Sequence, residues 1–234
     1  MDNLFFNEKS NIRFYNINIG MFEDWLNHTY FLEKLGYWLV IIRQFCYKKR
    51  GDIMYIWTGL VFNKKEEEYI RNICKKINEK YNLSEVSFTL PQHISLKTSF
   101  YYENYNEAIN YIKDVLSNIS QLSISVIGIS KINNGVIWFD IEETKELRNI
   151  HNILNNELLN RYNIPLIKFD GDNFKFHSTL FQDSKISDKH DKMIEELSNE
   201  FKFPIELNIK EINLGISEVG TVGTFKVCDK IELN

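Results

Sequence analysis

An internal repeat constrains the fold of this chain more than any other feature of its sequence. The order strand, helix, strand, helix, strand is predicted twice, over about residues 54–130 and 134–217. In each copy an apolar segment with a tryptophan comes first, and Gly-Ile-Ser lies in the last strand, at 128–130 and 215–217. Two units of about eighty residues suit a single domain with two lobes. We therefore predict a duplicated, two-lobed α+β domain over residues 54–234.

Apolar residues at helical spacing predict the helices of both copies. The first helix of each copy ends in Tyr-Asn, and the second follows a polar turn. The expected bounds are Lys64–Tyr81 and Glu142–Tyr162 for the first helices, and about Asn106–Asn118 and Ser187–Phe201 for the second. The order of elements therefore agrees between the two copies.

The middle strand of each copy carries the same polar pattern, His-Ile-Ser at 93–95 and His-Ser-Thr at 177–179. Side chains alternate between the faces of a strand, so each histidine shares a face with the hydroxyl two residues later. If the two histidines were unrelated, every other correspondence between the copies would be accidental. We therefore predict one site in which two imidazoles and two hydroxyls can hold a phosphate and move protons on both sides of it.

Composition narrows the class of protein. The chain of 234 residues is 44% hydrophobic and 26% charged, which is typical of globular proteins, and its net charge of −4 gives no basic field for long nucleic acid. The three scattered cysteines favour a reducing compartment and form no zinc motif. No signal peptide or membrane-spanning apolar run is apparent. We expect a cytoplasmic protein without a membrane segment, acting as a monomer.

Residues 1–53 belong to neither repeat. A helix is predicted over Phe22–Gly36, and the segment suits a docking arm or a cover for one lobe. The alternative is a non-native extension, since Met54 opens the first repeat strand directly. We treat residues 1–53 as an N-terminal extension, helical or not native.

The two motifs resemble those of the two-histidine (2H) phosphoesterase superfamily, in particular its 2′-5′ RNA ligase-like, or LigT-like, branch. The resemblance covers about residues 54–232. Ser95 stands where threonine is commoner, and Ser178 where the residue is often apolar. The resemblance implies antiparallel sheets, helices packed on the outside and a cleft between the lobes.

The resemblance and the chemistry of phosphodiester cleavage suggest the same roles for the motif residues. His93 and His177 would act as base and acid, because the imidazole titrates near neutral pH. Ser95 and Thr179 would donate hydrogen bonds to phosphate oxygens. Which histidine is the base stays open, and the scheme uses no metal and no cofactor.

Other side chains near the motifs are candidates for substrate binding. Lys97 and Lys175 share a face with the histidines and would add positive charge, unless they are ordinary solvated lysines at strand ends. Tyr55 and Trp57 could stack on a base. Trp138 is predicted to be part of the core.

Two further features receive structural interpretations. His151 is predicted to lie on the surface of its helix. Asp170, Asp172 and Asp183 flank the second motif, and Asp-Gly-Asp at 170–172 is interpreted as a turn and not as a metal site.

Two classes of function remain. The first is a metal-independent phosphodiesterase that acts on 2′,3′-cyclic phosphates, on 2′-5′ bonds of RNA or nucleotides, or on cyclic oligonucleotides. The second is a non-catalytic module that binds a nucleotide or an RNA end. The presence of both motifs favours the enzyme, because a binding module has no evident need for two titrating groups.

Overall fold

The computed structural model describes residues 54–132, 135–167 and 170–234. The predictions for residues 1–53 lie outside the described residues. The elements, in chain order, are β1 (Met54–Val61), α2 (Lys64–Tyr81), η2 (Val86–Phe88), β2 (His93–Tyr102), α3 (Tyr105–Leu116), β3 (Leu122–Ile132), β4 (Val136–Ile141), α4 (Lys145–Tyr162), β5 (His177–Gln182), η3 (Ser184–Ile186), α5 (His190–Glu200), β6 (Ile205–Ile209), β7 (Glu211–Ser217) and β8 (Lys226–Glu232).

Capping residues explain where the longer helices begin and end. The α2 helix has the expected bounds, and Asn63 caps its start by accepting a hydrogen bond from the backbone N–H of Glu66. The α4 helix begins at Lys145 and not at Glu142, because Thr144 is its N-cap. Asn82 and Asn163 end α2 and α4 in the left-handed conformation, with φ of 50° and 54°. The Tyr-Asn pairs of the repeat are therefore helix C-termini.

The second helices of the repeat are shorter than expected. The α3 helix covers Tyr105–Leu116, with Asn104 as its N-cap. The α5 helix begins at His190 and not at Ser187, because η3 forms a separate short turn before it.

The strands form two antiparallel sheets of four, in the orders β2-β1-β7-β8 and β5-β4-β3-β6. The closing strands of the two copies are exchanged. The β3 strand of the first copy pairs with β4, and the β7 strand of the second copy pairs with β1. Each sheet therefore contains strands from both copies, which the sequence repeat does not indicate.

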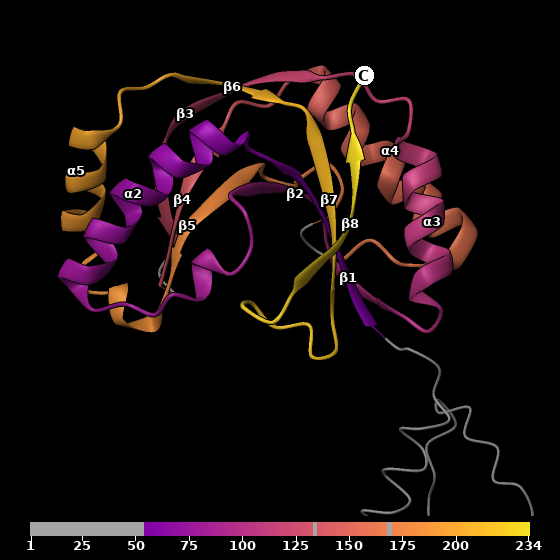
Figure 1. Ribbon diagram of the computed structural model, residues 1–234, viewed down its shortest axis with the longest axis horizontal. Coiled ribbons are helices and arrows are strands. Elements are labelled where there is room, and N and C mark those ends of the chain that lie inside the picture. Colours follow the sequence, from indigo (N-terminus) through magenta and orange to yellow (C-terminus); the bar gives the residue numbers. More distant parts are fainter. Residues whose placement is uncertain (1–53, 133–134, 168–169) are drawn as a thin grey trace, which may run out of the picture. The chain divides into compact units, whose positions relative to one another are not determined.

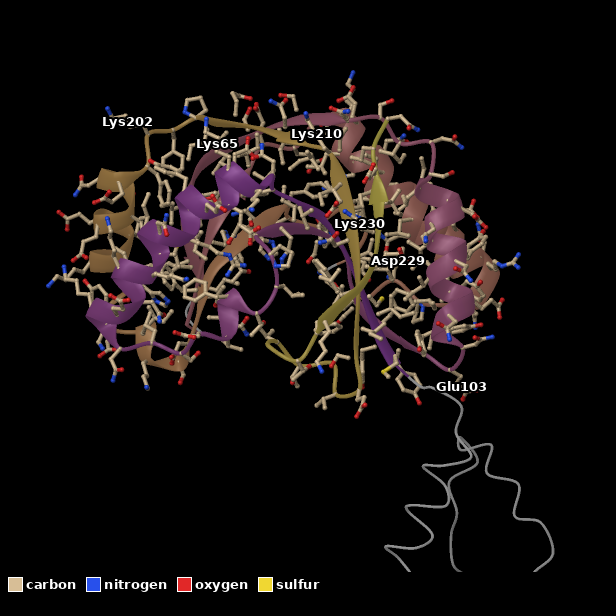
Figure 2. The ribbon with its side chains drawn as sticks, viewed as in Figure 1. Lys65, Glu103, Lys202, Lys210, Asp229 and Lys230 are labelled. Carbon is tan, nitrogen blue, oxygen red and sulfur yellow. The ribbon has the colours of Figure 1, made fainter. Side chains whose placement is uncertain are left out.

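Helices lie on the outer sides of the two sheets (Figure 1). The α2 helix contacts α5, which contacts β3, while α3 contacts α4, which contacts β2. A salt bridge between Lys113 of α3 and Asp229 of β8 joins the outer helix pair to the last strand, with Nζ and Oδ2 2.6 Å apart. Asp229 is labelled in Figure 2. The two-lobed arrangement with helices outside is confirmed.

One continuous hydrophobic core runs through both halves of the domain. Its largest fully buried side chains include Phe139, Phe176, Phe181 and Phe201. Burial of each such aromatic side chain stabilises the fold by roughly 1.5–3 kcal/mol. A shared core of this kind holds the two sheets together as one unit.

Both histidine strands are edge strands. The β2 strand is at one end of its sheet and β5 at one end of the other, and the two strands contact each other. The strands that carry the two motifs are therefore adjacent although they belong to different sheets. No helix in the described part of the chain has the length and apolar character needed to cross a membrane.

Candidate active site

The structure brings the two sequence motifs to one cavity. His93 and Ser95 of β2 and His177 and Thr179 of β5 all line a cavity of about 310 Å³. Each motif projects its histidine and its hydroxyl into the same space because the two residues share a strand face.

Both histidines are oriented by the same backbone contact. The Nδ1 atom of His93 lies 2.7 Å from the carbonyl oxygen of Pro91, and Nδ1 of His177 lies 2.8 Å from that of Lys175. A carbonyl oxygen only accepts, so Nδ1 must carry the proton and donate it. In the neutral form Nε2 of each ring is then left without a proton and is available for proton transfer.

The surroundings of the site favour neutral histidines. Burial lowers the pKa of His93 from 6.5 to about 4, and the positive charges of His177 and Arg71 act in the same direction. Burial also lowers the pKa of His177 and outweighs the hydrogen bond to the Lys175 carbonyl, which raises it, while the positive charge of Lys175 adds to the lowering. A bound phosphate anion would oppose both shifts by favouring a protonated imidazole.

A tryptophan packs against the histidine in each half of the site. The Trp57 ring centroid lies 4.4 Å from that of His93 at an interplanar angle of 70°, and its Nε1–H donates to Oγ of Ser95 over 3.1 Å. The Trp138 ring centroid lies 4.4 Å from that of His177, at an interplanar angle of 35°. Trp138 is partly exposed, so the prediction that it belongs to the core is wrong. Trp138 does not line the cavity, and its contact with His177 was missed because an aromatic side chain in a strand is more often core.

The two tryptophans match in sequence but not in strand register. Thr179 pairs directly with Trp138, whereas Ser95 pairs with Gly59. A Cβ atom on Gly59 would lie 2.4 Å from Cζ2 of Trp57. The absence of a side chain at Gly59 therefore makes room for the indole of Trp57 to reach Ser95.

Comparison with known protein families decides the identity of the fold. Residues 71–221 match the sequence model of the 2′-5′ RNA ligase superfamily, and this range includes both motifs. The chain belongs to the 2′-5′ RNA ligase superfamily. The predicted resemblance is confirmed, and the family and fold support a phosphodiesterase of the two-histidine type.

Solved structures share the fold of this superfamily member. TT0787 of Thermus thermophilus is 14% identical with a TM-score of 0.56, and covers 77% of this chain and 98% of its own. Apo LigT of E. coli is 12% identical with a TM-score of 0.51, and covers 79% of this chain and 99% of its own. Comparison with curated protein sequences gives no significant match.

Lys97 does not act as a free positive charge in this superfamily member. Its Nζ atom lies 2.8 Å from Oδ2 of Asp170 and donates to Oδ1 of Asn155 over 2.9 Å. The side chains of Lys97 and Asp170 are 2% and 1% exposed. Lys97 borders the cavity, but its ammonium group is paired with a buried carboxylate. It is therefore neither a solvated lysine nor an unpaired positive charge for the phosphate.

Lys175 and Tyr55 lie outside the lining of the cavity in the structure. Lys175 is 61% exposed and pairs with Asp140, with Nζ and Oδ1 3.0 Å apart. Tyr55 packs against Tyr101 and lies over Gly220. Trp57 does line the cavity, but it is 5% exposed, which leaves little of its ring free to stack on a base.

His151 is buried, and the prediction of a surface position is wrong. It is 0% exposed, its Nδ1 lies 2.7 Å from the carbonyl oxygen of Leu96, and its ring stacks on Phe174. The reason is that α4 packs against β2, which the sequence of α4 alone does not indicate.

The predicted turn at Asp170 has Gly171 at φ +92°. Within the described ranges, no cluster of three or more His, Cys, Asp or Glu side chains could hold a metal ion.

The charged residue Arg71 was missed by sequence reasoning. Its Nε–H donates to Oε1 of Glu67 over 2.7 Å, its Nη1 donates to the carbonyl oxygen of Phe88 over 2.9 Å, and its Nη2 donates to the carbonyl oxygen of Leu90. Arg71 thus holds the segment that follows η2, where Leu90 forms part of the cavity wall. The spacing of Glu67 and Arg71, four residues apart on a helix, is a signal for their ion pair but not for this second contact.

Proposed function

We propose that this protein is a metal-independent phosphodiesterase that cleaves 2′,3′-cyclic phosphates or 2′-5′ phosphodiester bonds of RNA or nucleotides. The observation that carries the proposal is the pair of histidines in one cavity, each held through Nδ1 by the carbonyl of the residue two positions before it. A nucleotide, an oligonucleotide or an RNA end would be the substrate, and the enzyme would act as a monomer in the cytoplasm.

In the proposed reaction one histidine takes a proton from water through its Nε2 atom. The water oxygen then forms a bond to phosphorus while the bond to the leaving ribose oxygen breaks. The other histidine, protonated, gives its proton to that oxygen. His93 and His177 end the cycle with their protonation states exchanged, and proton transfer through solvent restores them.

The hydroxyl groups are placed to stabilise the phosphate as its charge increases. The Oγ atom of Ser95 accepts the N–H of Trp57, so its own proton is left to donate into the cavity. Thr179 is the corresponding donor from β5. Hydrogen bonds to a charged acceptor are roughly twice as strong as neutral ones, which makes these two donors useful where negative charge develops.

A substrate panel tests the proposal. Purified protein in EDTA is incubated with 2′,3′-cyclic nucleotides, 2′-5′ dinucleotides and cyclic oligonucleotides, and products are separated by chromatography. We expect turnover of at least one class, a loss of about 10²–10⁴ in kcat in His93→Ala, and wild-type kcat in His190→Gln, since His190 lies outside the cavity.

The same panel distinguishes the non-catalytic alternative. Tight binding of a nucleotide or RNA end without any product, in EDTA or with added divalent metal, would contradict the proposed enzyme and support a binding module. Turnover that disappears in EDTA would contradict the metal-independent scheme.

A further inference from the structure

The relative position of the two histidines is not set by backbone pairing. His93 lies in the sheet β2-β1-β7-β8 and His177 in the sheet β5-β4-β3-β6. Strand pairing in the described residues joins β2 to β1 and β5 to β4, with no ladder between β2 and β5. Some other contact must hold the two edge strands in register with each other.

Side chains of Gln92 and Ser178 make this contact. The Nε2 atom of Gln92 donates to Oγ of Ser178 over 2.6 Å and to the carbonyl oxygen of Thr179 over 2.9 Å. Ser178 in turn donates from Oγ to the carbonyl oxygen of His93 over 2.6 Å. The chain of hydrogen bonds therefore starts on the backbone of Thr179, ends on that of His93, and crosses between the two segments three times.

Both residues of this contact are buried. Ser178 lies between His177 and Thr179, so strand alternation directs its side chain to the face opposite theirs. Gln92 directly precedes His93 and borders the cavity, but its amide nitrogen is held by Ser178 and by the backbone of Thr179. Gln92 is 6% exposed and Ser178 is 0% exposed, so water does not compete for these hydrogen bonds.

The hydrogen-bonding capacity of the pair is well used. Both amide protons of Gln92 have acceptors, and the Ser178 hydroxyl both accepts and donates. The backbone of Gln92 is held as well, because its carbonyl oxygen accepts the N–H of Phe62 over 3.0 Å. A buried network of this kind favours one geometry, since another arrangement would leave a buried donor without its acceptor.

We propose that Gln92 and Ser178 are positioning residues that set the separation between the His93 motif and the His177 motif. The inference rests on the proposed function, because it concerns how one phosphate is reached by both imidazoles. Both residues act through the two strands and not on the substrate. A misplacement of reacting groups by about 1 Å can reduce a rate by about 10²-fold, so the loss of this contact is expected to act on kcat.

The test compares Ser178→Ala and Gln92→Met with Asn78→Ala. The control removes a buried amide that donates to the carbonyl oxygen of Leu83 over 3.3 Å, away from the cavity. We expect Ser178→Ala and Gln92→Met to lower kcat by about 10–10²-fold with KM changed by less than about threefold. The double variant should lose less than the product of the two single losses, because both substitutions remove the hydrogen bond between Gln92 and Ser178, while each single variant keeps one other hydrogen bond between the strands. Asn78→Ala should lower the melting temperature and leave kcat at the wild-type value.

A second readout separates failure of this inference from failure of the proposed function. The His93 and His177 ring resonances are followed by NMR against pH in wild type, Ser178→Ala and Asn78→Ala. Because the charges of His177 and Arg71 both face His93, we expect its titration midpoint to rise in Ser178→Ala as the two rings separate, and to stay unchanged in Asn78→Ala.

Each outcome decides the inference. Unchanged kcat in Ser178→Ala, with wild type active, overturns it. If wild type cleaves no substrate, the proposed function fails and the titration alone decides the positioning role. In that case an unchanged His93 midpoint in Ser178→Ala overturns the role, and a raised midpoint supports it.

Discussion

Replacement of Lys97 by methionine should destabilise the protein far more than replacement of any exposed lysine near the site. In Lys97→Met the carboxylate of Asp170 stays buried and loses its ammonium partner. It retains the backbone N–H groups of Thr98, at 3.1 Å, and Ile167, at 3.3 Å. The amide oxygen of Asn155 also loses its donor. Methionine is close to lysine in length and fills the space, so lost packing contributes little.

The size of the effect follows from burial. Removal of one partner from a buried ion pair costs about 3–5 kcal/mol, because the remaining charge is left uncompensated. Lys175→Met removes the pair with Asp140, but that lysine is 61% exposed, and exposed pairs contribute about 0–1 kcal/mol. With a total stability of about 5–15 kcal/mol for a typical domain, Lys97→Met should still fold at low temperature.

Equilibrium unfolding in urea, followed by tryptophan fluorescence in phosphate-free buffer, measures both variants. We expect the free energy of unfolding to fall by about 3–5 kcal/mol in Lys97→Met and by less than about 1 kcal/mol in Lys175→Met. If Lys97 were instead a free phosphate ligand, Lys97→Met would raise KM and leave stability within about 0.5 kcal/mol of wild type. That result would refute the buried ion-pair argument.

The histidines and Gly59 lead to three further predictions. Since the pKa values of His93 and His177 both lie below 6.5, the optimum of kcat/KM should lie on the acid side of pH 6.5, and an optimum near pH 8 would contradict this. Burial lowers the pKa of His93 from 6.5 to about 4, so the folded state binds this proton more weakly than the unfolded state. Neutral His93 therefore contributes stability that is present above pH 6.5. As pH falls to about 4, the free energy of unfolding should drop by on the order of 3 kcal/mol. Urea unfolding of wild type and His93→Gln over this pH range should show a smaller drop in the variant. Gly59→Ala should displace the Trp57 ring and lower kcat by about tenfold or more, and unchanged kinetics would show that the indole does not support Ser95.

The repeat allowed much of the fold, and the grouping of the two histidine motifs in one cavity, to be predicted from sequence. Periodicity located the helices, and strand alternation placed each histidine beside its hydroxyl. These are local signals, and the structure agrees with them in α2, β2 and β5. Helix starts were less predictable, because Thr144 and the η3 turn decide where α4 and α5 begin.

What could not be predicted depends on contacts between distant segments. The exchange of β3 and β7 between sheets could not be predicted, because the repeat has the same order of elements whether or not these strands are exchanged. Lys97 and His151 were misjudged because their burial depends on α4 packing against β2. The contact between Gln92 and Ser178 could not be predicted from sequence, because it depends on the relative position of β2 and β5 in the folded protein.

The most direct test of the catalytic pair is the kcat of His93→Ala, His177→Ala and the double variant on the best substrate of the panel, in EDTA. If the two histidines act in one proton-transfer step, each single variant loses about 10²–10⁴ in kcat, and the double variant is no more than slightly worse than either one. Full activity in either single variant, with its fold retained, would contradict the assignment of His93 and His177 as the catalytic pair.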